Sequence, residues 1–253
     1  MPSAVAADCR LLILVPTRFE RQQLERLVAA RPSPHGSPTG AVRWSTIGFG
    51  PTIAGTMALD ALRRHAPQQA VLAGIAGSLD ERFPIGSVVE PDEVAIEGIG
   101  AWVDGELVGP ARLGWRLWEG TSDEPPERCG EIVQPLAPFN AACAGMSNES
   151  ASLAGHDAER IALLTVCAAS GSLAQAAARK GAFPNAVAEE MEGHSVAVAT
   201  RVAKVPLTIV RGISNIAGER DKRHWRIDAA LEAVAARLGV IIDALSIDRC
   251  GDA

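Results

Sequence analysis

Three carboxylates and a methionine lie close together in residues 187–195, which read VAEEMEGHS. Glu189, Glu190 and Glu192 stand between two apolar segments that are expected to be buried. A carboxylate near a core must be paired with another group or have a function, such as binding or catalysis. Met191 offers a flexible, polarisable surface against which a flat ligand can pack. The other interpretation is an acidic helix N-terminus, exposed to solvent and stabilised by the helix dipole.

A fourth carboxylate, Glu20, follows the apolar run at residues 11–15. Open α/β sheets bind ligands beyond the carboxyl ends of their strands, so Glu20 is a candidate for the same site. A surface charge in the first turn of a helix over residues 18–30 is the alternative. Glycine-containing turns at residues 48–50 (GFG) and 74–79 (GIAGSL) let a ligand approach the backbone, although GFG alone lacks the full dinucleotide fingerprint.

Short apolar runs alternate along the chain with segments of helical period, and this alternation is typical of an α/β fold. We predict one domain over residues 1–253, a three-layer αβα sandwich with a central, mostly parallel mixed sheet. The predicted strands are residues 11–15, 42–47, 70–73, 86–89, 160–167, 186–188 and 207–210, and the predicted helices are residues 18–30, 53–64, 173–180, 195–203 and 227–245.

Residues 101–152 lack clear periodicity and contain Trp102, Trp115, Trp118 and several prolines. We interpret them as an irregular excursion of long loops with short helices. The tryptophans could form a ligand platform or anchor the excursion to the core, and we favour anchors.

The composition excludes several classes of protein. With 47% hydrophobic and 21% charged residues, the 253-residue chain is typical of a globular protein. A net charge of −6 leaves no basic face for nucleic acid and favours a small-molecule partner. The N-terminal apolar run fits neither a signal peptide nor a membrane span, so we expect a cytoplasmic protein.

The cysteines form no CxxC pair, which favours reduced thiols, and we expect no metal site, disulfide framework or cofactor. Cys167, within the run IALLTVCAAS, is interpreted as a small buried hydrophobic residue. The five cysteines are Cys9, Cys129, Cys143, Cys167 and Cys250.

Three motifs together resemble the nucleoside phosphorylase and nucleosidase superfamily. The resemblance is closest to the branch that contains methylthioadenosine/S-adenosylhomocysteine nucleosidases and futalosine hydrolases. GIAGSL (residues 74–79) resembles that family's GSAGGL, EEMEG (189–193) its VEMEG, and VRGISN (210–215) its VRAISD. Three motifs in the family's order are far more specific than any one alone, and the resemblance is weakest over residues 101–152.

The resemblance implies a role for each matching residue. Glu192 would accept hydrogen bonds from the ribose hydroxyls, and Met191 would pack on the sugar. Ala76 and Gly77 would form the floor beneath it. Glu20 matches the family's glutamate that binds and deprotonates the attacking water.

Asn215 stands where the adenine-specific members have an aspartate, and Ser214 precedes it as in the family motif. An asparagine cannot act as an acid, but its amide can donate to N7 or to a 6-oxo group. A carboxylate would repel that oxygen, so we expect a 6-oxopurine rather than adenine; an asparagine in a tolerant turn is the alternative. Ser170 and Gly171 resemble the base-side loop, where Leu173 departs from the usual aromatic.

These features favour the futalosine hydrolase branch, whose substrate is a hypoxanthine nucleoside with an aromatic acid on C5′. The implied reaction converts futalosine to dehypoxanthine futalosine and hypoxanthine, in menaquinone biosynthesis. Arg220, Arg223 or Trp225 could contact the carboxylated tail or only cap the last helix.

Water is the expected nucleophile rather than phosphate. Phosphorylases of the superfamily have an arginine before the third-strand glycine, where this chain has Ala73, and Glu20 would repel phosphate. Arg18 and Arg43 are the two arginines that could hold phosphate instead and so contradict this expectation. The alternatives are a purine nucleoside phosphorylase, a methylthioadenosine/S-adenosylhomocysteine nucleosidase, or a non-catalytic nucleoside-binding protein. The resemblance also implies a homodimer or a higher homo-oligomer.

Overall fold

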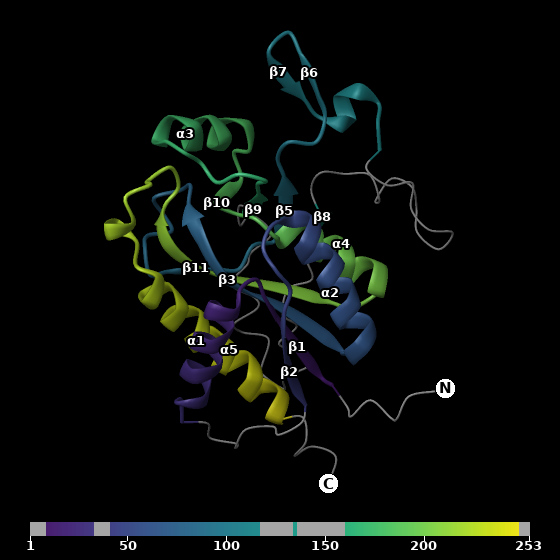
Figure 1. Cartoon of the computed structure of the whole chain (residues 1–253), viewed down its shortest axis with the longest axis vertical. Helices are drawn as coiled ribbons and strands as arrows, with labels where there is room; N and C mark the ends of the chain where they lie inside the picture. Colours follow the sequence, from purple (N-terminus) through teal and green to yellow (C-terminus); the bar gives the residue numbers. More distant parts are fainter. Residues whose placement is uncertain (1–8, 33–40, 117–133, 136–159, 248–253) are drawn as a thin grey trace.

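The computed structural model describes residues 9–32, 41–116, 134–135 and 160–247. Its centre is a nine-stranded mixed sheet with helices on both faces (Figure 1). This confirms the predicted α/β architecture. The strands of the sheet are β1 (Leu11–Val15), β2 (Val42–Thr46), β3 (Gln69–Ser78), β4 (Val88–Val89), β5 (Glu93–Ile96), β8 (Gln134–Pro135), β9 (Ala162–Thr165), β10 (Ala186–Glu190) and β11 (Leu207–Ile216).

The strand order is β2-β1-β3-β10-β9-β5-β8, and β11 pairs with β3 and β4. Strands β2, β1, β3 and β11 run parallel, as do β10, β9 and β5. The pairs β10–β3, β11–β4 and β5–β8 are antiparallel. Although β10 is antiparallel to β3, the two strands pair only near their carboxyl ends, through Ala188 with Ser78 and Glu189 with Gly77. The carboxyl ends of β1, β3 and β11, which run parallel, therefore lie near that of β10, and the predicted site segments come together.

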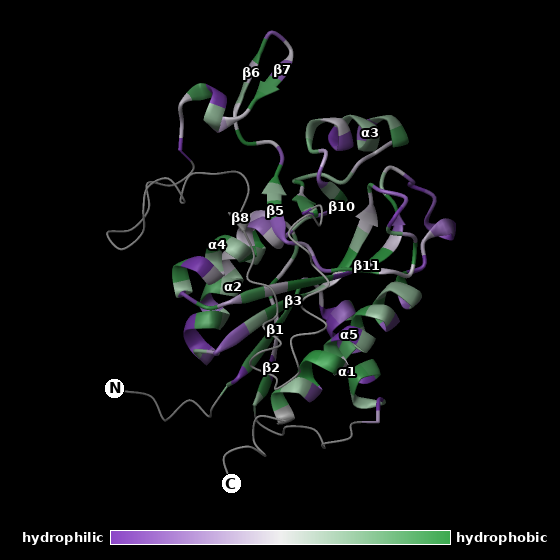
Figure 2. Ribbon diagram, turned by 180° about the vertical axis from the view of Figure 1, so that it is seen from behind, coloured by the Kyte–Doolittle hydropathy of each residue, from purple (hydrophilic) through white to green (hydrophobic). Residues whose placement is uncertain are grey.

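Two helices pack against each face of the sheet. Leu12 and Leu14 of β1 point to one core, and Leu11, Ile13 and Val15 point to the other, because side chains alternate along a strand. Figure 2 shows hydrophobic residues along much of α5 and the central strands. Helices α2 (Pro51–His65) and α4 (Gly193–Ala203) cover the first core, α1 (Arg18–Ala29) and α5 (Ile227–Ile247) cover the second, and α3 (Leu173–Ala182) follows β9.

The sequence directs where the first two helices begin. Thr17 caps α1 through a reciprocal capping box with Glu20, so the start of the helix fixes that carboxylate. Helix α2 begins with Pro51, whose fixed φ suits the first helical position. Gly50 before it has φ +82°, a conformation that favours glycine.

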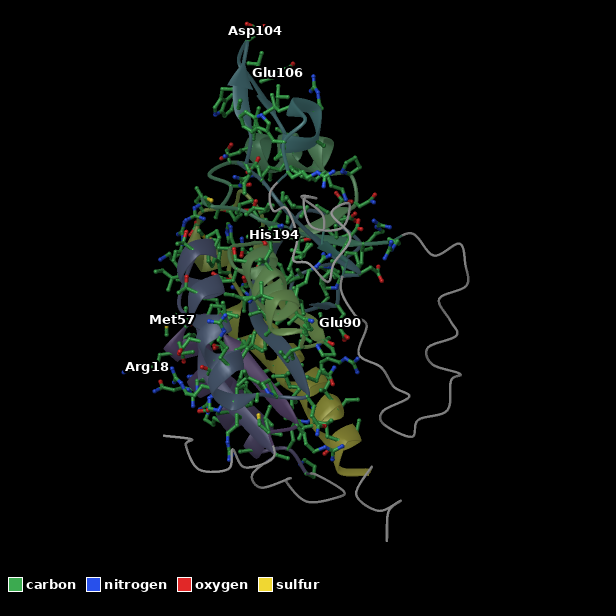
Figure 3. All side chains as sticks on the ribbon, turned by 90° about the vertical axis from the view of Figure 1, so that its right-hand side faces the viewer. Arg18, Met57, Glu90, Asp104, Glu106 and His194 are labelled. Carbon is green, nitrogen blue, oxygen red and sulfur yellow. The ribbon has the colours of Figure 1, made fainter. Side chains whose placement is uncertain are left out.

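Residues 101–152 differ in part from the predicted loops with short helices. A β-hairpin, β6 (Ala101–Val103) with β7 (Glu106–Val108), precedes the short 3₁₀ helix η1 (Pro110–Leu113). Asp104 and Glu106 lie at the hairpin tip (Figure 3). Trp102 and Trp115 are 75% and 56% exposed, so their interpretation as core anchors was wrong. Trp118 and most of the remaining excursion lie outside the described residues.

Two further differences concern single features. Cys167 is exposed rather than buried, because β9 ends at Thr165 and the chain then leaves the sheet. Strand β5 was not predicted, since its sequence EVAI follows a proline and lacks a longer apolar run.

No helix in the described part of the chain has the length and hydrophobicity needed to cross a membrane.

Candidate active site

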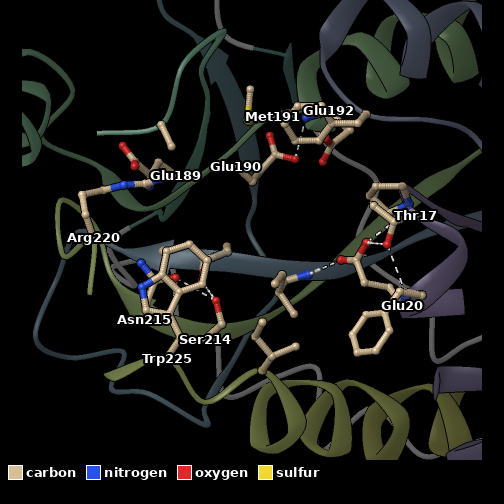
Figure 4. A pocket seen from close by; sticks show the side chains of 18 of the residues that line it. Thr17, Glu20, Glu189, Glu190, Met191, Glu192, Ser214, Asn215, Arg220 and Trp225 are labelled. Atoms are coloured by element: carbon tan, nitrogen blue, oxygen red, sulfur yellow. Dashed lines mark hydrogen bonds between the residues drawn. The ribbon is translucent and has the colours of Figure 1, made fainter. Parts of the chain in front are cut away.

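A cavity of about 250 Å³ lies where the strand ends converge (Figure 4). Glu20 and Thr17 lie on one side of it, and Ser214 and Asn215 lie on the other, with residues 189–192 along the wall between them. The lining also includes Ala76 and Gly77 on β3. Four carboxylates from two segments thus share one cavity, as the sequence predicted for Glu20 and Glu192.

Glu20 is buried and held in one orientation by three hydrogen-bond donors. The Thr17 amide and hydroxyl donate to Oε2, at 3.2 and 2.5 Å, and the Ile75 amide donates to Oε1 at 3.2 Å. A carboxylate oxygen accepts more than one hydrogen bond, so Oε1 keeps a lone pair for a ligand or water. The solvent-exposed alternative for Glu20 was therefore wrong.

Glu190 is a positioning residue, because its carboxylate is already surrounded by donors. The Glu192 and Gly193 amides and the Thr165 hydroxyl donate to it, and it forms an ion pair with Arg211. These bonds fix the turn between β10 and α4. Glu190 and Glu189 are buried, so the alternative that they belong to an exposed helix start was wrong.

Glu192 keeps acceptor capacity that Glu190 has lost. The Gly50 amide donates to Oε1 at 3.2 Å, and Arg211 Nη2 donates to Oε2 at 3.1 Å. One lone pair on each oxygen is left for two further donors, which suits a vicinal diol. Burial raises the pKa of Glu192 to about 7; Arg211 opposes the rise, Glu190 adds to it, and the Gly50 amide opposes it.

Arg211 is the cation that compensates these carboxylates. It is fully buried in β11, and Nη2 contacts both Glu190 and Glu192. Its Nε and Nη1 have no hydrogen-bond partner among the described residues. A Cβ on Gly74 would collide with Arg211 Nη1 and lie 3.0 Å from Glu20 Oε1, so glycine is required for this close approach.

Asn215 lies in β11 after a β-bulge rather than in a turn. Its Oδ1 accepts from the Ser214 hydroxyl at 2.8 Å, and its Nδ2 donates to the Ile216 carbonyl at 2.8 Å. These two bonds fix which end of the amide is the donor, and the second N–H of Nδ2 stays available. A Cβ on Gly77 would lie 3.4 Å from Nδ2, so the floor of the cavity closely adjoins the amide.

The base-side segment is held by a buried ion-pair network. Ser170 donates to Glu189 through both its amide (2.8 Å) and its hydroxyl (2.6 Å). Arg179 of α3 donates to Glu189, to the Ser170 hydroxyl and to the Ala168 carbonyl, and pairs with Glu97. Ser170 is buried behind the wall and does not line the cavity, and its amide and hydroxyl are already bonded to Glu189.

The remaining predicted residues divide between the cavity and the surface. Met191 and Ser214 line the cavity, whereas Gly171 does not and Leu173 is 63% exposed. Arg18 lies at the surface (Figure 3) in a separate polar groove, and Arg43 does not line the cavity.

The predicted residues between β11 and α5 are likewise divided. Arg220 and Trp225 line the cavity, with the guanidinium 5.6 Å from the ring centroid. Arg223 lies outside it and pairs with Asp221.

Sequence reasoning missed the roles of Arg211 and Arg179. An arginine within the otherwise apolar strand LTIVRGISNI is a signal that could have been used, because a charge in a buried strand must be paired. Arg179 gave no comparable signal, since a basic residue in the last turn of a helix is usually a surface residue.

Comparisons with known proteins agree with this geometry. A protein named futalosine hydrolase from Acidothermus cellulolyticus is 31% identical over 230 residues, 89% of this chain and 85% of that protein. One from Streptomyces coelicolor is 30% identical over 175 residues, which is 69% of this chain and 65%, just under two thirds, of that protein.

Solved structures share the fold at lower identity. A methylthioadenosine/S-adenosylhomocysteine nucleosidase from Helicobacter pylori, in complex with butyl-thio-DADMe-Immucillin-A, gives a TM-score of 0.68 at 16% identity, covering 93% of this chain and 98% of that one. The futalosine hydrolase of Helicobacter pylori gives 0.64 at 16% identity, covering 94% and 97%. The family model described as the phosphorylase superfamily matches residues 37–246, and the chain therefore belongs to the phosphorylase superfamily.

Proposed function

We propose that this protein is a nucleosidase that hydrolyses the N-glycosidic bond of futalosine and releases hypoxanthine. The observation that carries the proposal is the single cavity lined by Glu20, Glu192 and Asn215. The two relatives named futalosine hydrolase support the choice of substrate.

In this proposal Glu192 binds the ribose of the substrate. Its two free lone pairs accept hydrogen bonds from the 2′ and 3′ hydroxyls, and Met191 packs against the ribose ring. As the bond from C1′ to N9 breaks, positive charge grows on the ribosyl carbon. The ionised carboxylate stabilises that charge, and Arg211 keeps a useful fraction of Glu192 ionised near neutral pH.

Glu20 binds the attacking water through Oε1. The water oxygen forms the new bond to C1′, and its proton passes to the Glu20 carboxylate. Thr17 and Ile75 hold that carboxylate in place before the substrate arrives, so little reorientation is needed during the reaction.

Asn215 stabilises the leaving purine. Hypoxanthine departs with the electron pair of the broken bond, and the free N–H of Nδ2 donates to N7 or to the 6-oxo oxygen. Because an amide supplies no proton, the departing base takes its proton from solvent.

Water rather than phosphate is the nucleophile in this proposal. Glu20, Glu189, Glu190 and Glu192 all line the cavity and would repel a phosphate dianion. The two arginines that pair with three of these carboxylates, Arg179 with Glu189 and Arg211 with Glu190 and Glu192, are buried.

The test is to incubate the protein with futalosine, inosine and methylthioadenosine, each with and without phosphate, and to separate the released bases. We expect hypoxanthine from futalosine in phosphate-free buffer. Glu20→Gln should slow release by about 10²–10⁴-fold, and Glu192→Gln by about 10²–10³-fold. Release that requires phosphate, adenine as the preferred product, or no release at all would each contradict the proposal.

We also propose that the protein works in the cytoplasm as a homodimer or a higher homo-oligomer. The exposed apolar side chains of Trp102 and Val103 on the β6–β7 hairpin support an association surface. Light scattering coupled to size exclusion would give the oligomeric state, and a monomer at micromolar concentration would contradict it.

A further inference from the structure

A second cavity adjoins the active-site cavity and shares three of its lining residues, Phe19, Trp225 and Ile227. Its volume is about 510 Å³. Phe19 precedes Glu20 in α1, and Trp225 precedes Arg226, whose amide donates to the Ser214 carbonyl, so the second cavity adjoins both the Glu20 side and the Ser214 side of the site. Lys222 and Arg226 complete its wall together with the first residues of α5.

The charges around this second cavity are not balanced locally. Three hydrogen bonds from the Arg223 side chain engage Asp221, so that cation is neutralised. Lys222 has no carboxylate partner within the described residues, and Arg226 donates only to backbone carbonyls, through Nη1 to Arg223 and Trp225. Asp228 is the single carboxylate of the lining.

The entrance to the second cavity is aromatic. Phe19 is 52% exposed, and the Trp225 indole is held by a hydrogen bond from Nε1 to the Glu219 carbonyl at 3.1 Å. Exposed aromatic side chains beside an opening are suited to pack against an aromatic ligand. An aromatic entrance followed by two cations that lack acidic partners matches an aromatic carboxylate.

We propose that the second cavity binds the carboxylated aromatic substituent on C5′ of the nucleoside. The aromatic part lies between Phe19 and Trp225, and its carboxylate is bound by Lys222 and Arg226. This inference rests on the proposed function for the identity of the substrate. It assigns the tail to Lys222 and Arg226, and Arg223 is excluded because Asp221 already neutralises it.

The experiment measures binding in a variant with slowed turnover. Glu20→Gln provides the background, because glutamine also serves at that position of a capping box and cleavage of the bound nucleoside is about 10²–10⁴-fold slower. Calorimetry compares futalosine with its methyl ester, which keeps the aromatic group and loses the charge. We expect futalosine to bind about tenfold more tightly than the ester. Adding Lys222→Gln and Arg226→Gln should abolish the difference, whereas the matched control Arg223→Gln should preserve it.

Two results would overturn the tail site. One is equal binding of futalosine and its ester by the Glu20→Gln protein, and the other is a preference that persists in the protein carrying both Lys222→Gln and Arg226→Gln. Ester binding in every variant verifies that the variants are folded. Hypoxanthine release by the unsubstituted protein is measured separately, so failure of the proposed function is distinguished from failure of the tail site.

Discussion

Replacing Asn215 with aspartate tests the basis of the proposed base specificity. In the structure Oδ1 accepts from Ser214 and Nδ2 donates to the Ile216 carbonyl, both at 2.8 Å. With Ser214 still donating to one oxygen, aspartate would place its other oxygen against the Ile216 carbonyl. The carboxyl group must then take up a proton or repel that carbonyl, and when ionised it cannot donate to a 6-oxopurine.

The magnitude follows from the donor that is lost. A buried hydrogen bond left unmade costs about 1–3 kcal/mol, which corresponds to roughly 5–150-fold in rate or binding. We therefore expect kcat/KM for futalosine to fall by about 10–100-fold at pH 8. The loss should be smaller at pH 6, because a protonated carboxyl group can again donate. Relative activity on the 6-amino analogue of futalosine should rise.

The assay is the initial rate of base release from the two nucleosides at both pH values. Asn185→Asp is the matched control, because it makes the same charge change at an exposed position outside the cavity. Its rates should be unchanged. Activity of Asn215→Asp on futalosine at pH 8 equal to or above that of the unsubstituted protein would refute the reasoning.

Four further predictions concern the residues around the cavity. Because burial raises the pKa of Glu192 to about 7 and the ionised form is needed, kcat/KM should rise with pH through about 7; a flat profile from pH 6 to 8 would contradict this role. The pKa of Glu192 is raised from its ordinary value of 4.5, which applies to the unfolded chain, to about 7 in the folded protein. The free energy of unfolding should therefore decrease as the pH rises from 4.5 to 7, and Glu192→Gln should flatten that decrease in thermal melts. Arg179→Met removes the cation that pairs with the buried Glu189 and the partly exposed Glu97, so we expect about 3–5 kcal/mol of destabilisation in urea titrations and a higher KM. An unchanged urea midpoint would contradict the importance of this ion-pair network. Gly74→Ala should lower kcat/KM by displacing Arg211, whereas Gly181→Ala, which meets no atom within 4 Å, should stabilise the protein by about 0.5–1 kcal/mol and leave the rate unchanged.

Much of the fold could be predicted because its signals are local. The buried run Leu11–Val15 and the capped helix Arg18–Ala29 were predicted almost to the residue. The last strand was predicted too short, since it continues from Val210 through polar residues to Ile216. Polar residues in a buried strand look like a loop until their partners in the fold are known.

The hairpin of residues 101–108 and the exposure of its tryptophan show a second limit. A tryptophan in an irregular segment is usually packed, so Trp102 was interpreted as an anchor. Its 75% exposure depends on where the hairpin projects, which no local pattern of the sequence specifies.

The candidate site shows the same division between sequence and structure. The sequence by itself determined which segments were candidates for the site, because the motifs around Glu192 and Asn215 and the strand end before Glu20 are short and local. Only the tertiary structure decided that Glu190 is saturated by donors while Glu192 keeps two lone pairs free, and that Arg211 lies between them. Those properties depend on desolvation and on distances between residues far apart in the chain, and such quantities exist only once the strands have been brought together.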